Sequence, residues 1–375
     1  MSTAPNVAVI GAGPAGLAGA RRLRDGGASV VMIVPEAASE YLPGTLAVAT
    51  GDASAASYRT RVDVAGIEII PGRAEAIEPG SIRVNGSWHR FQAVVAAPGL
   101  ALDLVGGTVP GPVLGFWDPS GAEAAAPRLA AVERGVVDVV ISSVPYRCPP
   151  APYGLAMRIA RRARRRELAV EVRLRTPERH PLEVLGRTLG DVLLAACADA
   201  GVEVHLGAVV DPEALAAGAV TEDPVDHRRA ALTFVIPPHR ASPLVAGLVR
   251  GESPLVPVDE RFATEMPGVF VVGDAAASPY PRADGPAAWS GTVAADAVLA
   301  ELGLGGTQSP ATPQADCFVD HGDGAYARFH ISYPDGPPPN GRPEIAVEPP
   351  ARARARDFDD AFRRWRALRA EGTAR

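Results

Sequence analysis

The sequence is poor in the features that mark secreted, membrane-spanning or nucleic-acid-binding proteins. Its 375 residues include only three cysteines, so we expect no structural disulfide framework, and any cysteine pairing is expected to serve catalysis. It has no run of about eighteen apolar residues, the length that suggests a membrane-spanning helix. The net charge of -6 gives no general case for nucleic acid as a partner. No signal peptide fits before the first predicted strand, near Asn6, and the expected location is therefore the cytoplasm.

A glycine-rich turn near the N-terminus is the strongest motif. Residues 7–10 predict a short buried strand, and the residues after Gly16 predict a helix. Gly11 permits a tight turn, Gly13 lets a pyrophosphate approach the backbone, and Gly16 lets the helix pack on the strand. A second strand follows over 29–34, which is the context that a dinucleotide-binding turn requires. The predicted ligands are Gly11, Gly13, Pro14, Ala15 and Gly16; the alternative is a glycine-rich turn without a ligand.

Three further segments complete the predicted cofactor site. Glu36 stands two positions beyond the second strand, whereas a dinucleotide fold usually carries an acid at the strand tip to hold the ribose. Pro98 and Gly99 form a small-residue turn after another buried strand. Gly273 and Asp274 end a late apolar strand, and this pair together with the early glycine turn is more specific than either alone. The alternative for Asp274 is a solvated turn residue.

A second αβ unit begins near Gly135, and it lacks a glycine loop. Residues 136–144 predict a strongly apolar strand, and residues 155–166 predict a basic helix. Between them lies a proline-rich segment, 145–153, where a nucleotide-binding unit would have glycines. This unit therefore looks like a nicotinamide domain whose nucleotide loop has been replaced, which argues against NAD(P)H as the electron donor.

These patterns predict an α/β fold with two dinucleotide-binding (Rossmann-like) domains and a C-terminal extension. The predicted boundaries place the first part of the cofactor domain at 1–108, the second Rossmann-like domain at 109–230, the rest of the cofactor domain at 231–306 and a C-terminal segment at 307–375. A helix is expected over 285–302. Residues 307–351 are expected to be irregular because they are rich in proline.

The chain resembles the sulfide-oxidising flavoproteins with two dinucleotide-binding domains. These are the flavoprotein subunit of flavocytochrome c sulfide dehydrogenase and, next to it, sulfide:quinone oxidoreductase. The most specific part of the resemblance is the segment Arg147-Cys148-Pro149-Pro150-Ala151-Pro152-Tyr153. The remaining segments that carry it are 11–16, 97–99, 236–240, 256–259, 273–275 and 316–318, so it covers most of the chain.

The resemblance implies FAD and a redox-active pair of cysteines over the flavin, with Cys148 matching the first cysteine and Cys317 the second. The family's covalent flavin link uses a cysteine in the region that matches Tyr41-Leu42-Pro43. No cysteine stands there, so FAD is expected to be bound noncovalently.

A disulfide supplies the electrophilic sulfur that hydrosulfide would attack, and FAD supplies a two-electron acceptor. Arg147, next to Cys148, is expected to favour the thiolate. The alternative for both Cys148 and Cys317 is a buried, small apolar residue. Cys197 is expected to lie in the core on an apolar helix face, and His239 is expected to be structural.

The predicted function is therefore an FAD-dependent oxidoreductase that oxidises sulfide or a related sulfur compound and passes electrons to a quinone or a protein acceptor. Two alternatives remain: a disulfide or polysulfide reductase that uses the same cysteines in reverse, and a flavin-binding redox sensor or assembly protein. No metal site is expected.

The tail predicts an amphipathic helix over 357–370. Phe358, Ala361, Phe362, Trp365 and Leu368 share one face, and arginines surround them. Such a helix can lie in a membrane interface, which suggests peripheral contact at the inner membrane face. The favoured alternative is a helix docked on its own domain or on a second subunit.

Overall fold

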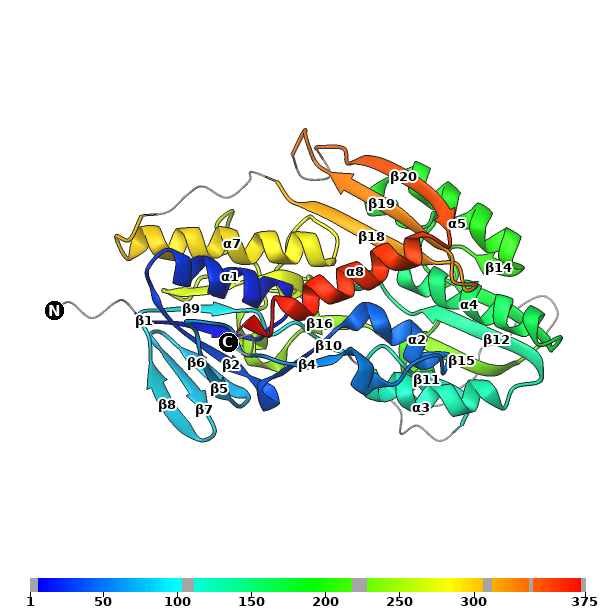
Figure 1. Ribbon diagram of the computed structural model, residues 1–375, viewed down its shortest axis with the longest axis horizontal. Coiled ribbons are helices and arrows are strands. Elements are labelled where there is room, and N and C mark those ends of the chain that lie inside the picture. The colour runs from blue at the N-terminus through cyan, green and yellow to red at the C-terminus, as the bar shows by residue number, and fades with distance from the viewer. Residues whose placement is uncertain (1–5, 103–110, 218–227, 306–311, 337–339, 372–375) are drawn as a thin grey trace.

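The chain folds into two parallel sheets, with a smaller antiparallel sheet beside the second (Figure 1). The computed structural model describes residues 6–102, 111–217, 228–305, 312–336 and 340–371. Within these segments each parallel sheet has five strands. This is the predicted α/β fold with two Rossmann-like units and a C-terminal extension.

The first sheet contains the glycine-rich turn. Its strand order is β17-β9-β1-β2-β5, and all neighbours are parallel. Helices α1 (Pro14–Asp25) and α7 (Asp284–Glu301) lie together on one face, and the small sheet β6-β7-β8 lies on the other side (Figure 1). The strand bounds are β1 Asn6–Ile10, β2 Ser29–Val34, β5 Glu68–Pro71, β6 Ala74–Glu78, β7 Ser81–Val84, β8 Ser87–Arg90, β9 Ala93–Ala96 and β17 Val269–Val271.

The second sheet has the order β11-β15-β12-β13-β14 and is also parallel. Helices α4 and α5 lie on its upper side and α3 lies below it in Figure 1. The bounds are β11 Val113–Gly115, α3 Pro119–Ala130, β12 Arg134–Ile141, α4 Ala151–Arg165, β13 Ala169–Arg175, α5 Arg187–Ala200, β14 Val202–His205, α6 Pro212–Ala216 and β15 Ala230–Ile236.

Two antiparallel strands join the units where the chain leaves and re-enters the first one. β10 (Leu100–Leu102) pairs with β16 (His239–Ala241). The strand β15 is hydrogen-bonded to β11 and β12, so the predicted boundary between residues 230 and 231 separates this strand from its own sheet. An apolar strand followed by prolines is compatible with either parallel sheet, so the sequence pattern of β15 does not show which strands it pairs with.

The prediction that residues 307–351 are irregular is wrong for the described part of that range. β18 (Gln314–Asp320), β19 (Tyr326–Ser332) and β20 (Glu344–Ala351) form an antiparallel sheet. In β19 buried and partly exposed residues alternate, which is the period-two pattern of a strand with one face in the core. The core residues Phe329 and Ile331 belong to the same hydrophobic cluster as the second sheet. The C-terminal sheet therefore completes the core of the second unit.

The helix boundaries differ from the predictions where prolines occur. α4 begins at Ala151, four residues earlier than predicted, because Pro150 and Pro152 lie at its first turn, where a missing N–H is tolerated. Strand β12 ends at Ile141, three residues before the predicted end. Helix α8 spans Arg354–Ala367, three residues earlier at each end than predicted. Further short elements are α2 (Thr45–Ala49), β3 (Ala38–Glu40) and β4 (Arg59–Arg61). Among the described helices, none combines the length and apolarity needed to cross a bilayer.

Candidate functional site

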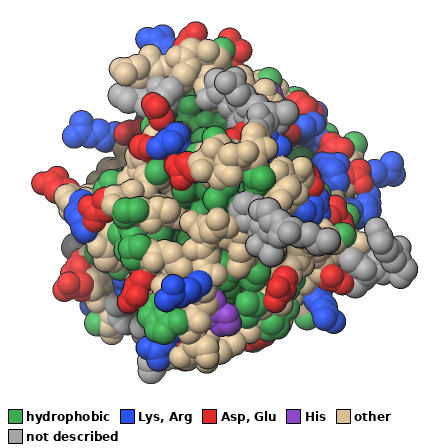
Figure 2. Space-filling model, turned by 90° about the vertical axis from the view of Figure 1, so that its left-hand side faces the viewer, with side chains coloured by type: hydrophobic (Ala, Val, Ile, Leu, Met, Phe, Trp, Pro, Cys, Tyr) green, Lys and Arg blue, Asp and Glu red, His purple; other side chains and the backbone are tan. Residues whose placement is uncertain are grey.

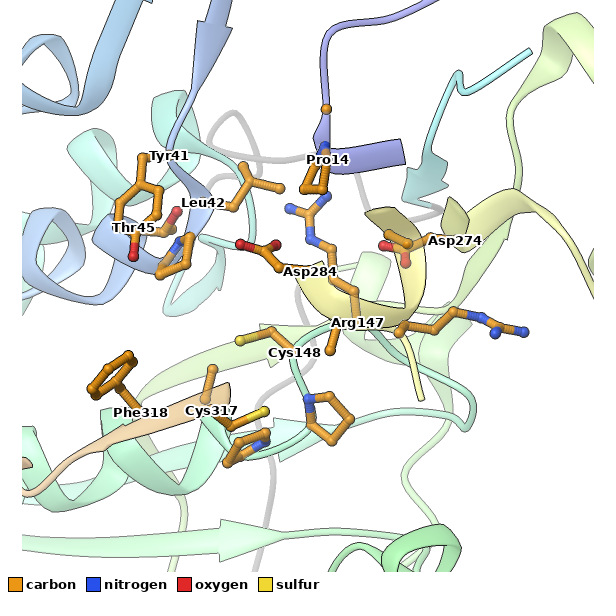
Figure 3. Close-up of a pocket in the computed structure, with 18 of the residues that line it drawn as sticks. Pro14, Tyr41, Leu42, Thr45, Arg147, Cys148, Asp274, Asp284, Cys317 and Phe318 are labelled. Carbon is orange, nitrogen blue, oxygen red and sulfur yellow. The ribbon is translucent and has the colours of Figure 1, made fainter. Parts of the chain in front are cut away.

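A cavity of about 340 Å³ lies where the two units and the C-terminal segment meet (Figure 3). Its volume falls in the range of small-molecule sites, roughly 300–1,000 Å³. The lining comes from the glycine-rich turn, α2, the segment after β12, the start of α7, strand β18 and helix α8. Parts of the chain from position 13 to position 364 therefore share one wall.

The glycine-rich turn presents backbone to this cavity. Gly11 has φ +91°, and a Cβ on Gly16 would lie 2.0 Å from the Gly11 carbonyl oxygen, so these two positions fit strand and helix together. A Cβ on Gly13 would meet nothing within 4 Å. Helix α1 begins without a side-chain cap, so its first amides can bind an anion. Gly13, Pro14 and Ala15 line the cavity, as a bound pyrophosphate would require.

The other predicted cofactor residues divide into two groups. Gly99, Gly273 and Asp274 line the cavity, whereas Pro98 is not part of its wall. Glu36 lies outside the cavity, has a left-handed backbone (φ +52°) and forms an ion pair with Arg59. A ribose contact by Glu36 stays a prediction, and it would have to compete with this ion pair.

Cys148 and Cys317 both line the cavity, although they come from different units (Figure 3). Cys148 lies between β12 and α4, and Cys317 lies on β18 opposite Phe329 of β19. All three cysteines of the chain are in described segments, and all three are free thiols. Cys197 is fully buried on α5, as expected for a core residue. The structure thus brings the predicted pair to one cavity without joining it by a disulfide.

The thiols are not ionised by their surroundings. Burial raises the pKa of Cys148 to about 12, with a further contribution from Asp284, and Arg147 opposes this only in part. Burial also raises the pKa of Cys317, and the charges of Cys148 and Asp284 raise it further. Arg147 thus favours the thiolate of Cys148, as expected, but desolvation outweighs this one adjacent cation and Cys148 stays a thiol.

Asp284 is the cavity residue that the sequence analysis missed. It is the first residue of α7, one position before the predicted start of that helix, and its carboxylate projects into the cavity beside Cys148 (Figure 3). Desolvation raises its pKa, Arg369 opposes the rise and Asp274 adds to it. An acid at the start of a helix soon after the Gly-Asp motif is the signal that could have identified it.

Helix α8 forms the outer wall of the cavity through Phe358, Ala361 and Arg364. Its aromatic face surrounds Tyr41, with ring centroids 5.9 Å from Phe358, 5.1 Å from Phe362 and 5.3 Å from Trp365. Leu368, predicted to share this face, is 41% exposed. The apolar face of the tail is thus packed on its own chain, which is the alternative that the sequence analysis favoured.

The end of the tail reaches the glycine-rich turn through Ser39. Buried Arg369 donates from Nε to Ser39 Oγ at 3.1 Å, and Ser39 donates to the Ala12 carbonyl at 3.1 Å.

His239 is also buried, and its Nδ1 lies 2.6 Å from the Pro237 carbonyl oxygen. Burial and the charge of Arg147 lower the pKa of His239 to about 3, so it is neutral, as expected for a structural histidine.

Within the described residues, His, Cys, Asp and Glu side chains form no group suited to a metal ion. On the face shown in Figure 2, acidic and basic side chains of the described residues are interspersed, and neither sign forms a continuous area. This face has no basic surface of the kind that binds nucleic acid.

No protein-family model and no curated protein matches the sequence. Solved structures do match. The sulfide:quinone oxidoreductase of Aquifex aeolicus superposes with a TM-score of 0.77 at 17% identity, covering 99% of this chain and 93% of that one. The chain has the fold of that enzyme.

Two other reductases match less closely. Putidaredoxin reductase, in its covalent complex with putidaredoxin, gives a TM-score of 0.64 at 16% identity, covering 98% of this chain and 94% of that one. An NAD-dependent persulfide reductase from A. fulgidus gives 0.60 at 17% identity, covering 96% and 77%. At these identities the similarity establishes a fold with two dinucleotide-binding domains.

Proposed function

We propose that the chain is an FAD-dependent oxidoreductase that oxidises sulfide or a related sulfur compound through Cys148 and Cys317. Electrons would then pass to a quinone or a protein acceptor. The observation that carries the proposal is that both cysteines and the glycine-rich turn line one cavity. The resemblance in the segment around Cys148 and the fold shared with sulfide:quinone oxidoreductase support it.

The residues present fit a bound dinucleotide. The open position at Gly13 and the uncapped start of α1 would hold the pyrophosphate, and Asp274, which also lines the cavity, would stand on the flavin side of the cofactor, as the resemblance implies. Tyr41, Leu42 and Pro43 line the cavity where the family's linking cysteine would stand, so no cysteine link forms there. When bound, FAD supplies a two-electron acceptor.

The cysteines would carry the sulfur chemistry. Both are thiols here, so the pair must first lose two protons and two electrons to become a disulfide, and FAD, when bound, would accept the electrons. Hydrosulfide then attacks one sulfur, the S–S bond breaks, and the products are a persulfide on one cysteine and a thiolate on the other. A second hydrosulfide takes the terminal sulfur of the persulfide and leaves as hydrogen disulfide, so that both cysteines become thiolates. Oxidation of these two thiolates to the disulfide releases two electrons, for which FAD is the acceptor when bound.

Anaerobic titration with sulfide tests this proposal. The flavin absorbance of the purified holoprotein should bleach, and Cys148→Ser or Cys317→Ser should abolish the bleaching while FAD stays bound. Cys197→Ser is the matched control and should bleach like the wild type, because Cys197 lies in the core away from the cavity. Full activity in either of the first two variants would exclude the cysteine mechanism. Acid precipitation should leave the flavin in the supernatant, whereas flavin in the pellet would exclude noncovalent binding.

A further inference from the structure

The segment that carries Cys148 has a tyrosine at each end, Tyr146 and Tyr153, and both tyrosines bind one carboxylate. The Tyr146 hydroxyl donates to Glu178 Oε2 at 3.1 Å, and the Tyr153 hydroxyl donates to the same oxygen at 3.1 Å. Glu178 lies just after strand β13 and is distant in sequence from the segment. One side chain therefore joins the start of the loop to the first turn of α4.

Glu178 is itself held in place by its own loop. The Thr176 hydroxyl donates to Oε2 at 3.0 Å, and the Leu182 amide donates to Oε1 at 3.1 Å. The three side chains that donate to Glu178, those of Tyr146, Tyr153 and Thr176, are buried. Among the described residues Glu178 forms no ion pair with a cation, so these hydrogen bonds are what hold it. Burial raises the pKa of Glu178, and the hydrogen bonds from Thr176, Tyr146 and Tyr153 oppose that rise. The network therefore holds this carboxyl group at one position between its loop and the two tyrosines.

The backbone at Cys148 needs such an attachment. Its φ is +52°, a left-handed conformation that a residue with a Cβ adopts only when the surrounding structure imposes it. On the cavity side, the Cys148 amide donates to the Arg282 carbonyl at 2.8 Å. Just after it, the Ala151 amide donates to the Cys148 carbonyl at 2.9 Å. On the other side, the Tyr146 hydroxyl also lies 3.3 Å from the Pro149 carbonyl oxygen, next to the bond to Glu178.

We propose that Glu178 is a positioning residue that, through Tyr146 and Tyr153, holds the 146–153 segment so that Cys148 faces the cavity. We call the hydrogen-bonded group of Glu178, Tyr146 and Tyr153 the clamp. Its effect on catalysis rests on the function proposed above, whereas its effect on the position of Cys148 does not. Loosening the clamp should give two opposite effects. Cys148 should become more accessible and more easily ionised, and sulfide-dependent reduction of the flavin should become slower because the thiol no longer holds its place.

The test measures alkylation of each cysteine by iodoacetamide at pH 8 in the intact holoprotein, with mass spectrometry of the peptides. In Glu178→Gln, alkylation of Cys148 should accelerate at least about fivefold, and Cys317 should stay within about twofold of the wild type. Tyr146→Phe should give a smaller acceleration. Adding it to Glu178→Gln should give little more than Glu178→Gln alone, because both act through one network. Glu133→Gln, an exposed acid just before β12 and outside this network, is the control and should leave all rates unchanged.

Unchanged alkylation of Cys148 in Glu178→Gln would overturn the proposal, and so would equal acceleration at Cys148 and Cys317, which indicates general loosening. If Glu178→Gln does not fold, Tyr146→Phe and Tyr153→Phe make the same comparison. If the wild type shows no reduction by sulfide, the proposed function fails, and the alkylation result still decides whether the clamp exists.

Discussion

In each parallel sheet the central strand, β1 or β12, is followed by a turn that leads to a helix. The two turns differ in the groups that they present. After β1, three residues (11–13) separate the strand from α1, and Gly13 leaves open space above the backbone. After β12, nine residues (142–150) separate the strand from α4, and they carry Cys148 between Arg147 and two prolines. Both helices start with proline in the first turn and without a side-chain cap.

The comparison shows that one topology can present either backbone amides or a side chain at the same edge of a sheet. A short glycine turn brings an anion to the helix start, because nothing projects from the backbone. The longer turn, 142–150, contains no glycine, and it is held by hydrogen bonds from the Tyr146 hydroxyl to Glu178 and from the Cys148 amide to the Arg282 carbonyl. Under the proposed function, the first unit would hold the cofactor and the second would present a thiol to it.

The largest expected effect concerns nicotinamide nucleotides. Because the turn after β12 has no open glycine position, NADH and NADPH should reduce the bound flavin at least about a hundredfold more slowly than sulfide does, equivalent to roughly 2.7 kcal/mol in barrier height. Stopped-flow absorbance with each reductant at equal micromolar concentration measures this. Rapid bleaching by NADH would show that the two turns do not differ in nucleotide binding.

Two alanine substitutions separate the roles of the glycines in the first turn. Gly16→Ala should destabilise the protein by about 1–3 kcal/mol, because its Cβ would lie 2.0 Å from the Gly11 carbonyl oxygen. Gly13→Ala should change the free energy of unfolding of the apoprotein by less than about 0.5 kcal/mol. It should still weaken FAD binding at least about tenfold, a loss of roughly 1.4 kcal/mol, because its methyl group takes the space of the pyrophosphate.

Denaturant unfolding and titration with FAD measure the two quantities separately. If Gly13→Ala binds FAD like the wild type, the pyrophosphate does not approach the backbone there, and the contrast with the second turn disappears.

A smaller effect is expected for the charge of Asp284, in the first unit, on the pKa of Cys148, in the second. Asp284 of the first unit helps to raise the pKa of Cys148 to about 12, after burial. Asp284→Asn removes that negative charge, so the pKa of the thiol should fall and its alkylation at pH 8 should accelerate by about two- to fivefold. The rate should be followed from pH 7 to pH 10, with Asp25→Asn as a control at an exposed site on α1. A pH profile identical to that of the wild type would show that the two groups do not interact.

The smallest expected effect concerns the tail, where peripheral membrane contact stays a prediction. The aromatic face of α8 is packed on Tyr41, so contact with anionic vesicles would rest on exposed arginines such as Arg363 and Arg366. The intact chain should sediment with such vesicles at low salt, and about 0.5 M salt should abolish this by screening. A chain that ends at Glu348 should not sediment. If the two chains sediment with the vesicles to the same extent, α8 makes no membrane contact and serves only as part of the cavity wall.

The sequence by itself determined the features that depend on neighbouring residues. Strand β1, the glycine turn and α1 follow from an apolar run, three glycines and a helical period within about twenty residues. The turn at Asn85 and Gly86, both with positive φ, joins β7 to β8 as an Asn-Gly hairpin predicts. The core position of Cys197 follows in the same way from the apolar face of its helix.

Strand pairing, burial and contacts between distant segments could not be predicted from the sequence. Strand β15 could have joined either sheet, and its hydrogen bonds to β11 and β12 assign it to the second. The protonated state of Cys148 depends on how deeply the cavity is enclosed, and the sequence shows only the adjacent arginine. Asp284 stands at the start of a helix and Glu178 in a loop, and both acquire their roles because the chain brings them to the segment that carries Cys148. Local pattern is fixed by short-range sterics and periodicity, whereas burial and pairing across more than a hundred residues exist only once the core has formed.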